Sequence, residues 1–126
     1  MAASSTTLHE TNLSPDVVDR HRAIVSLMEE LEAVDWYDQR VQAASNDELR
    51  SILAHNRDEE KEHAAMMLEW LRRNDSAFAA HLATYLYSKG SITEVEEGTK
   101  AEGGAASSGA AAIADGSLGI GSLKGK

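Results

Sequence analysis

Glu60 and His63 are the two residues of this chain whose types and spacing most directly suggest chemistry. They stand three positions apart in the acidic segment 58–63, and in a helix such positions are neighbours on one face, about 5–6 Å apart at Cβ. A carboxylate and an imidazole at that separation can bind the same small cation. A Glu-x-x-His pair from each of two helices is also a component of di-iron carboxylate bundles.

Both side chains belong to an apolar stripe. In steps of three and four it contains Leu49, Leu53, Asn56, Glu60, His63, Met67, Trp70 and Leu71. This spacing places the candidate ligands on the side of a helix that faces other helices. An upstream stripe has a carboxylate near its middle in the same way: Leu27, Glu30, Val34, Tyr37 and Val41. Inward-facing acids in two helices require a partner, because burying an unpaired charge is costly.

The elements that must position these residues are two long helices. The first is predicted from residue 15 to about residue 44, because Ser14 suits the N-cap and Pro15 the first helical position. Its apolar stripe is wide enough to face more than one neighbour. The second helix is predicted to begin at once, since Ser45 and Glu48 have the spacing of a capping box.

So short a connection favours an antiparallel hairpin. Glu30 lies about 15 residues before the turn and Glu60 about 15 after it, so at equal rise per residue the two come level across the hairpin. The second helix is expected to end near Asn74. A short third helix, capped by Asp75 and ending before Gly90, is expected to pack on a neighbouring chain.

Composition divides the chain into four parts. Residues 1–13 are polar and aperiodic, which predicts disorder, and residues 14–89 form the helical domain. All nine glycines fall from Gly90 onward, so residues 90–115 are predicted to be a flexible linker. In residues 116–126 a cluster of apolar side chains can lie extended in a groove of another protein: Leu118, Ile120 and Leu123.

Charge and composition exclude several function classes. The net charge of −9 argues against nucleic-acid binding and favours a surface that attracts cations. The chain has no cysteine, its first residues do not resemble a signal segment, and no apolar run approaches the ~20 residues of a membrane helix. We expect a soluble, intracellular all-α protein that does not bind membranes.

One chain carries only half of a di-metal site. A di-iron bundle takes one Glu from each of two helices and one Glu-x-x-His from each of two others, and this chain supplies one of each. We therefore expect a twofold dimer in which two hairpins form a ferritin-like four-helix bundle. Glu60 would bridge two ions, and Glu30 and His63 would be terminal ligands for Fe, Mn or Zn.

Other residues near the predicted site have two interpretations each. Tyr37 can hydrogen-bond to a ligand and steady it. Glu29 and Glu32 point off the stripe and can pass ions inward, but a solvated helical face is the better explanation for either residue taken alone. For Glu60 and His63 the alternative is a hydrogen-bond network at a dimer interface.

Three stretches of the chain resemble the encapsulated ferritins, the iron-oxidising cargo of encapsulin nanocompartments. They are residues 24–40, residues 53–73 and the ending Gly121-Ser122-Leu123-Lys124. The resemblance implies a two-helix ferritin relative whose dimers join into an open ring of ten chains. It also implies a non-haem di-iron ferroxidase centre made of Glu30, Glu60 and His63 from two chains.

The resemblance further assigns roles outside the centre. Glu29 and Glu32 match positions that take up incoming metal, and Trp36 and Tyr37 match aromatic neighbours of the site. The terminal peptide would dock on the encapsulin shell protein, so the chain would work in the cytoplasm inside the compartment and deposit oxidised iron in its lumen. Gly119 stands where threonine is more usual and loosens this peptide.

Two other functions fit the same residues. A non-catalytic helical cargo protein would use these ligands to hold zinc, or nothing, and would serve assembly. A di-iron peroxidase related to rubrerythrins is disfavoured because the chain lacks the cysteines of a rubredoxin-like electron centre.

Overall fold

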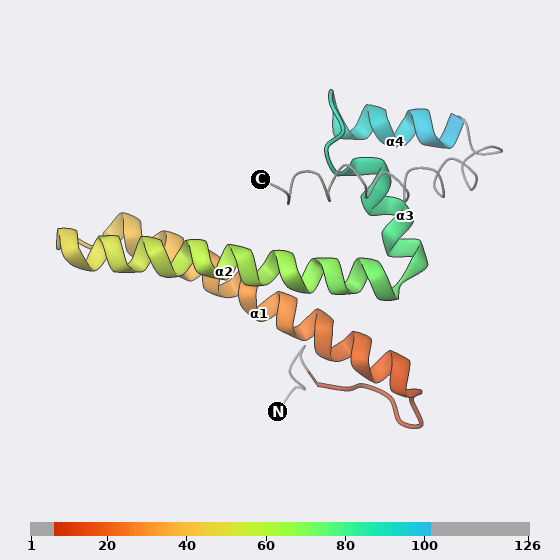
Figure 1. Ribbon diagram of the computed structural model, residues 1–126, viewed down its shortest axis with the longest axis horizontal. Helices are drawn as coiled ribbons and strands as arrows, with labels where there is room; N and C mark the ends of the chain where they lie inside the picture. Colours follow the sequence, from red (N-terminus) through yellow and green to blue (C-terminus); the bar gives the residue numbers. More distant parts are fainter. Residues whose placement is uncertain (1–6, 102–126) are drawn as a thin grey trace. The chain divides into compact units, whose positions relative to one another are not determined.

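The protein is described here by a computed structural model of residues 7–101, which contains four helices and, over that range, no strand (Figure 1). Their bounds are α1 Pro15–Ala43, α2 Asp47–Asn74, α3 Ser76–Tyr85 and α4 Ile92–Ala101. The chain divides after Asn74 into two compact units, the α1–α2 hairpin and the part that contains α3 and α4. The predicted all-α class and the antiparallel hairpin are confirmed.

The start of α1 follows the prediction. Ser14 is extended, and its Oγ accepts a hydrogen bond from the Val17 amide at 3.2 Å. Pro15 occupies the first helical position, where its missing N–H costs nothing. Residues 7–13 form no helix or strand, and the predicted disorder of the N-terminus stays a prediction.

The start of α2 differs from the prediction by one residue. Asn46, not Ser45, is the N-cap: its Oδ1 accepts from the Leu49 amide at 2.8 Å, and its carbonyl accepts from the Arg50 amide at 2.9 Å. The capping box of Ser45 and Glu48 is therefore wrong. The reason is that residues 44–46 are used to reverse the chain, beginning with the extended Ala44.

Substitutions at this connection distinguish the two caps. Asn46→Ala is expected to lower the free energy of unfolding by about 1 kcal/mol, because the Leu49 amide loses its acceptor. Ser45→Ala is a matched control one residue away. It is expected to change the free energy of unfolding by less than half as much. Urea unfolding followed by circular dichroism measures both, and a larger loss for Ser45→Ala would contradict the assignment.

The hairpin buries little of its apolar surface by itself. Only Ala23, Ala64 and Leu71 are buried among its described apolar residues. The α1 side chains Leu27, Val34 and Val41 are half-buried in the hairpin. A further group on α1 is 37–55% exposed: Val17, Ile24, Met28 and Leu31. The α1 stripe is thus wider than α2 can cover, as predicted.

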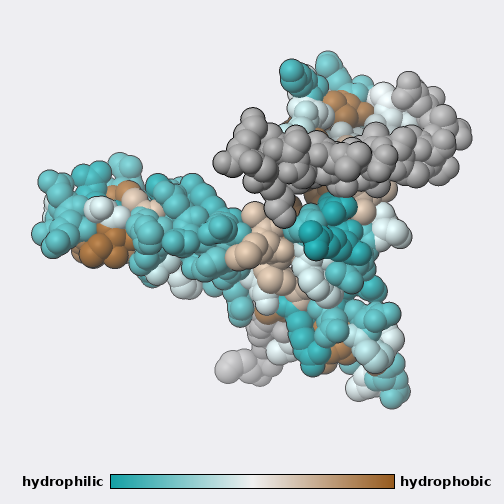
Figure 2. All heavy atoms as spheres, viewed as in Figure 1, coloured by the Kyte–Doolittle hydropathy of each residue, from teal (hydrophilic) through white to brown (hydrophobic). Residues whose placement is uncertain are grey.

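The surface view shows the same pattern. In Figure 2 apolar patches interrupt a largely hydrophilic surface, including one at the end of the hairpin where α1 connects to α2. Leu49 and Ile52, in the first turns of α2, are 47% and 52% exposed. Over residues 7–101, no helix is long and apolar enough to cross a membrane.

An ionic cluster holds the last turns of α2. Glu69 accepts hydrogen bonds from Arg72 Nε and Nη2, both at 2.7 Å, and from Arg73 Nε at 2.6 Å. The hydrogen bonds from Arg72 are the largest cause that lowers the pKa of Glu69 to about 2; burial opposes them, and the hydrogen bond from Arg73 adds to the lowering. Glu69 and Arg73 have the i,i+4 spacing of an ordinary ion pair along a helix.

The lowered pKa of Glu69 predicts a dependence of stability on pH. Because the folded pKa lies below the ordinary 4.5, ionised Glu69 stabilises the fold fully above pH 4.5 and progressively less as the pH falls toward 2. The parent chain should therefore have a higher free energy of unfolding than the Glu69→Gln variant above pH 4.5. This difference should shrink as the pH falls toward 2. Urea unfolding at several pH values measures it, and a difference that does not shrink on acidification would refute the interpretation.

The second unit contains one predicted helix and one that was not predicted. Asp75 caps α3 as expected, its Oδ1 accepting from the Phe78 amide at 3.0 Å. Helix α4, in contact with α3, occupies the first part of the predicted flexible linker 90–115, so that part of the prediction is wrong. Local contacts support this helix: Val95 N donates to the Ser91 carbonyl, and Glu96 pairs with Lys100 at 3.7 Å. The rest of the linker and residues 116–126 lie outside the described residues.

Candidate metal centre

Helices α1 and α2 bring Glu30, Glu60 and His63 together. His63 Nδ1 lies 3.1 Å from Glu30 Oε2 and 3.4 Å from Glu60 Oε1, and one candidate ligand atom from each residue lies within 4.8 Å of the other two. This is the juxtaposition that equal distances from the turn predicted. Glu60 and His63 meet because they are three residues apart on α2, and Glu30 meets them because the hairpin is antiparallel.

The positions of these atoms suit a cation. His63 Nδ1 points at two carboxylate oxygens, so either a proton on Nδ1 or a metal ion near the same place would offset their negative charge. Two carboxylates and one imidazole form a ligand set that suits Fe, Mn or Zn. The arrangement therefore fits both a metal centre and the hydrogen-bond network that was the alternative interpretation.

The group is open on one side within a single chain. The side chains of Glu30 and Glu60 are 23% and 22% exposed, while that of His63 is 44% exposed. Three protein ligands also leave a transition-metal ion with unfilled coordination positions. Both observations leave room for a second protein surface to cover the site.

The other predicted site residues lie around this group. Glu29 and Glu32 are exposed on α1, next to Glu30 in sequence. The Arg40 guanidinium lies 5.6 Å from the centre of the Tyr37 ring and 5.8 Å from that of the Trp36 ring, in cation–π contact with both. Within the described part of the chain no hydrogen bond joins Tyr37 to the proposed ligands, so its role, like those of Glu29 and Glu32, stays a prediction. Leu118, Ile120 and Leu123 lie outside the described residues.

One charged neighbour of the group was missed by the sequence analysis. Arg57, one helical turn before Glu60, donates from Nη1 to Asp38 Oδ1 on α1 at 3.0 Å and from Nε to Asp58 Oδ1 at 3.1 Å. The available signal was an arginine in the middle of α2, opposite an acidic stretch of α1. Its partner could not be chosen from several acids by spacing alone.

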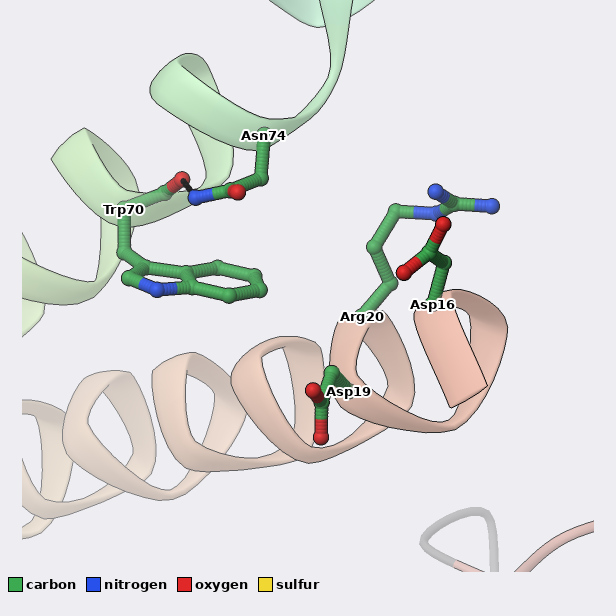
Figure 3. A pocket seen from close by; sticks show the side chains of 5 residues that line it. All are labelled: Asp16, Asp19, Arg20, Trp70 and Asn74. Carbon is green, nitrogen blue, oxygen red and sulfur yellow. Dashed lines mark hydrogen bonds between the residues drawn. The ribbon is translucent and has the colours of Figure 1, made fainter. Parts of the chain in front are cut away.

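A hollow between the two helices is a separate feature from the metal centre. A cavity of about 170 Å³ lies between the start of α1 and the end of α2, where the two helices diverge (Figures 1 and 3). Its lining consists of Asp16, Asp19, Arg20, Trp70 and Asn74. In Figure 3 the Trp70 indole forms one wall, and Asn74 Nδ2 donates to the Trp70 carbonyl at 2.9 Å. Trp70 is seven residues beyond His63, about 10 Å along the helix.

A pair of long antiparallel helices with inward carboxylates and a histidine defines a ferritin-like helical protein. The comparison with protein families is more specific, since the model of the EncFtn-like family matches residues 5–89. The chain belongs to this family, as the resemblance to encapsulated ferritins predicted.

Individual relatives agree with this assignment. An encapsulated ferritin-like protein of Rhodospirillum rubrum is 63% identical over 131 aligned positions, which cover 100% of this chain and 94% of the relative. The encapsulin nanocompartment cargo protein EncC of Myxococcus xanthus is 42% identical over 52 positions, covering 41% of this chain and 40% of the relative. A crystal structure of a protein from Nitrosomonas europaea is similar with a TM-score of 0.66 and 59% identity, covering 68% of this chain and 96% of that one.

Proposed function

We propose that this protein is a ferroxidase that binds Fe(II) between two copies of the chain and passes electrons to dioxygen. The observation that carries the proposal is the convergence of Glu30, Glu60 and His63 from two helices. Two such groups, related by a twofold axis, would complete the ligand set of a non-haem di-iron centre. Fe(II) is the substrate, and each ion gives up one electron.

The ligand chemistry favours oxidation of the bound ion. Carboxylate oxygens stabilise Fe(III) more than Fe(II), because the interaction of an anion with a cation grows with the cation's charge. Glu60 of each chain would bridge the two ions, while Glu30 and His63 would each bind one. Glu29 and Glu32, exposed beside Glu30, would attract incoming Fe(II), and Tyr37 would orient a ligand.

The need for a second copy is supported by the hairpin's exposed apolar surface. Ile24, Met28 and Leu31 on α1 are 39–55% exposed, and His63 is open to solvent on one side. A second hairpin that covered such surfaces would bury apolar area and exclude water from the ions. Metal binding and dimerisation should therefore stabilise each other. We extend the proposal to a ring of ten chains assembled from these dimers.

The storage role rests on the relatives and on the C-terminal segment. One relative is named as encapsulated and another as encapsulin cargo. Residues 116–126 would bind the encapsulin shell protein through Leu118, Ile120 and Leu123, which places the protein in the cytoplasm within the compartment. The oxidised iron would then be stored as mineral inside the shell.

The test combines iron content, particle mass and oxygen consumption. After anaerobic loading with Fe(II), we expect one iron per chain in an assembly with an even number of chains, and oxygen consumption on exposure to air. Glu30→Ala, Glu60→Ala and His63→Ala should each remove the bound iron and the oxygen consumption. Unchanged turnover in all three variants would refute the proposal.

A second function is favoured by one observation. His63 Nδ1 is already within 3.1 and 3.4 Å of the two carboxylates, a proximity that a hydrogen-bonded network serving assembly would also require. A structural cargo protein of this kind would hold zinc or no metal and would consume no oxygen with Fe(II). The oxygen measurement therefore separates the two functions.

A further inference from the structure

Arg57 ties the two long helices together beside the candidate metal centre. Its guanidinium is hydrogen-bonded on two sides, to Asp38 of α1 at 3.0 Å and to Asp58 of α2 at 3.1 Å. The Arg57 side chain is 23% exposed, whereas the two aspartates are 64% and 63% exposed. The arginine is therefore the enclosed member of the group and has a defined position.

Three polar contacts join α1 to α2 in the described hairpin. Near the connection Arg50 Nε donates to the Val41 carbonyl at 3.3 Å, and at the metal centre His63 pairs with Glu30 at 3.1 Å. Arg57 forms the middle contact. Apolar contacts between the helices are non-directional, whereas a hydrogen bond weakens steeply when its geometry changes. Of the three polar contacts, the one at Arg57 lies nearest to the proposed ligands without being one of them, and it limits how far α1 can slide along α2 at that level.

The register of the helices matters because the proposed ligands lie on both of them. Glu30 is on α1, while Glu60 and His63 are on α2, so a slip of α1 moves one ligand relative to the other two. A functional metal site requires its ligands within about 0.2 Å of their proper distances. Asp38 is eight residues from Glu30, about 12 Å along a stiff helix, and Arg57 is three residues from Glu60.

We propose that Arg57 is a positioning residue for the metal centre, holding Asp38 so that Glu30 stays at the correct distance from Glu60 and His63. This inference rests on the proposed metal binding. Arg57 is suited to the task because its planar guanidinium presents several donors in a fixed arrangement, which a lysine cannot do. Both neighbouring carboxylates offset its positive charge, so it adds little repulsion toward incoming cations.

The two aspartates that pair with Arg57 are 64% and 63% exposed, so both ion pairs lie near the surface. Exposed ion pairs of this kind contribute little to overall stability. A positioning role thus predicts a loss of metal binding without a matching loss of folding.

Co(II) binding to the full-length protein tests the proposal, because the visible bands of Co(II) report ligand geometry and the ion does not consume oxygen. Arg57→Gln and Asp38→Asn should each weaken Co(II) binding about tenfold and alter the bands, as removal of an orienting partner does. Combining the two should cause no further loss, since both remove the same contact. Arg57→Lys should fall between Arg57→Gln and the parent chain.

Arg50→Gln is the matched control, since it removes an arginine hydrogen bond between the same helices at the connection. It should leave Co(II) affinity unchanged, and its thermal midpoint should match that of Arg57→Gln. Parent-like affinity and bands in Arg57→Gln, or a loss explained by unfolding alone, would overturn the inference. If Glu60→Gln also binds Co(II) like the parent chain, both the metal centre and the inference fail; if only Glu60→Gln loses binding, the metal centre stands and the inference fails.

Discussion

Glu60→Gln is expected to reduce Fe(II)-dependent oxygen consumption at least about 100-fold while the hairpin stays folded. The substitution keeps the size of the side chain but removes the charge that would bridge two ions. Because each chain of a dimer would contribute this residue, both bridges are lost at once. Loss of an orienting neighbour already costs about 10–100-fold in metal sites, and loss of a bridging ligand should cost more.

The thermal stability of the metal-free Glu60→Gln variant should not fall with its oxygen consumption. Glu60 is 22% exposed and shares His63 with Glu30, so its charge is partly desolvated and lies close to a second carboxylate. Replacing it with a neutral amide removes this repulsion. The thermal midpoint of the metal-free variant should therefore equal or exceed that of the parent chain, which excludes unfolding as the cause of lost activity.

Glu62→Gln is the matched control for this experiment. It makes the same chemical change two residues away on α2, at an exposed position outside the group of proposed ligands. Oxygen consumption should stay at the parent level. Equal losses of oxygen consumption in the two variants would mean that the activity depends on the overall negative charge of the surface and not on ligation by Glu60. Full activity in Glu60→Gln would show that Glu60 is not a ligand of the centre.

Removing residues 116–126 is expected to abolish packaging into an encapsulin shell and to leave iron oxidation intact. The proposed ligands all lie on α1 and α2, whereas the apolar anchors Leu118, Ile120 and Leu123 lie in the removed segment. An extended segment binds through such anchors in pockets of its partner, so their loss should remove the association. Co-expression with the shell protein, followed by purification of the shell, measures packaging directly.

A deletion of equal length within the linker, residues 102–112, is the control for chain length. This variant keeps the terminal segment and should still co-purify with the shell. Both shortened chains should oxidise Fe(II) like the parent chain. The targeting assignment is wrong if the chain that lacks residues 116–126 still co-purifies with the shell.

The central geometry could be predicted because helices convert sequence distance into spatial distance. Ser14 and Pro15 predicted the start of α1, and the stripes predicted which sides of the helices would face inward. The similar separations of Glu30 and Glu60 from the turn predicted that they would meet, because both helices rise equally per residue. His63 followed from its spacing to Glu60, and all three side chains do lie together.

Choices among near-equivalent neighbours could not be predicted in this way. Asn46 and Ser45 are both good caps, and only the path of the chain reversal decided between them. Helix α4 forms where a glycine-containing, polar composition suggested a linker, and the pair of Glu96 and Lys100 is a local contact that supports it.

The sequence by itself determined the helical hairpin, the juxtaposition of the three proposed ligands and the excess of apolar surface on α1. Only the tertiary structure decided which acid receives Arg57 and how the two helices are held in register near the ligands. The physical reason is that periodicity follows from backbone geometry common to all helices. The pairing of a long, flexible side chain depends on the rotation and separation of two particular helices after they have packed.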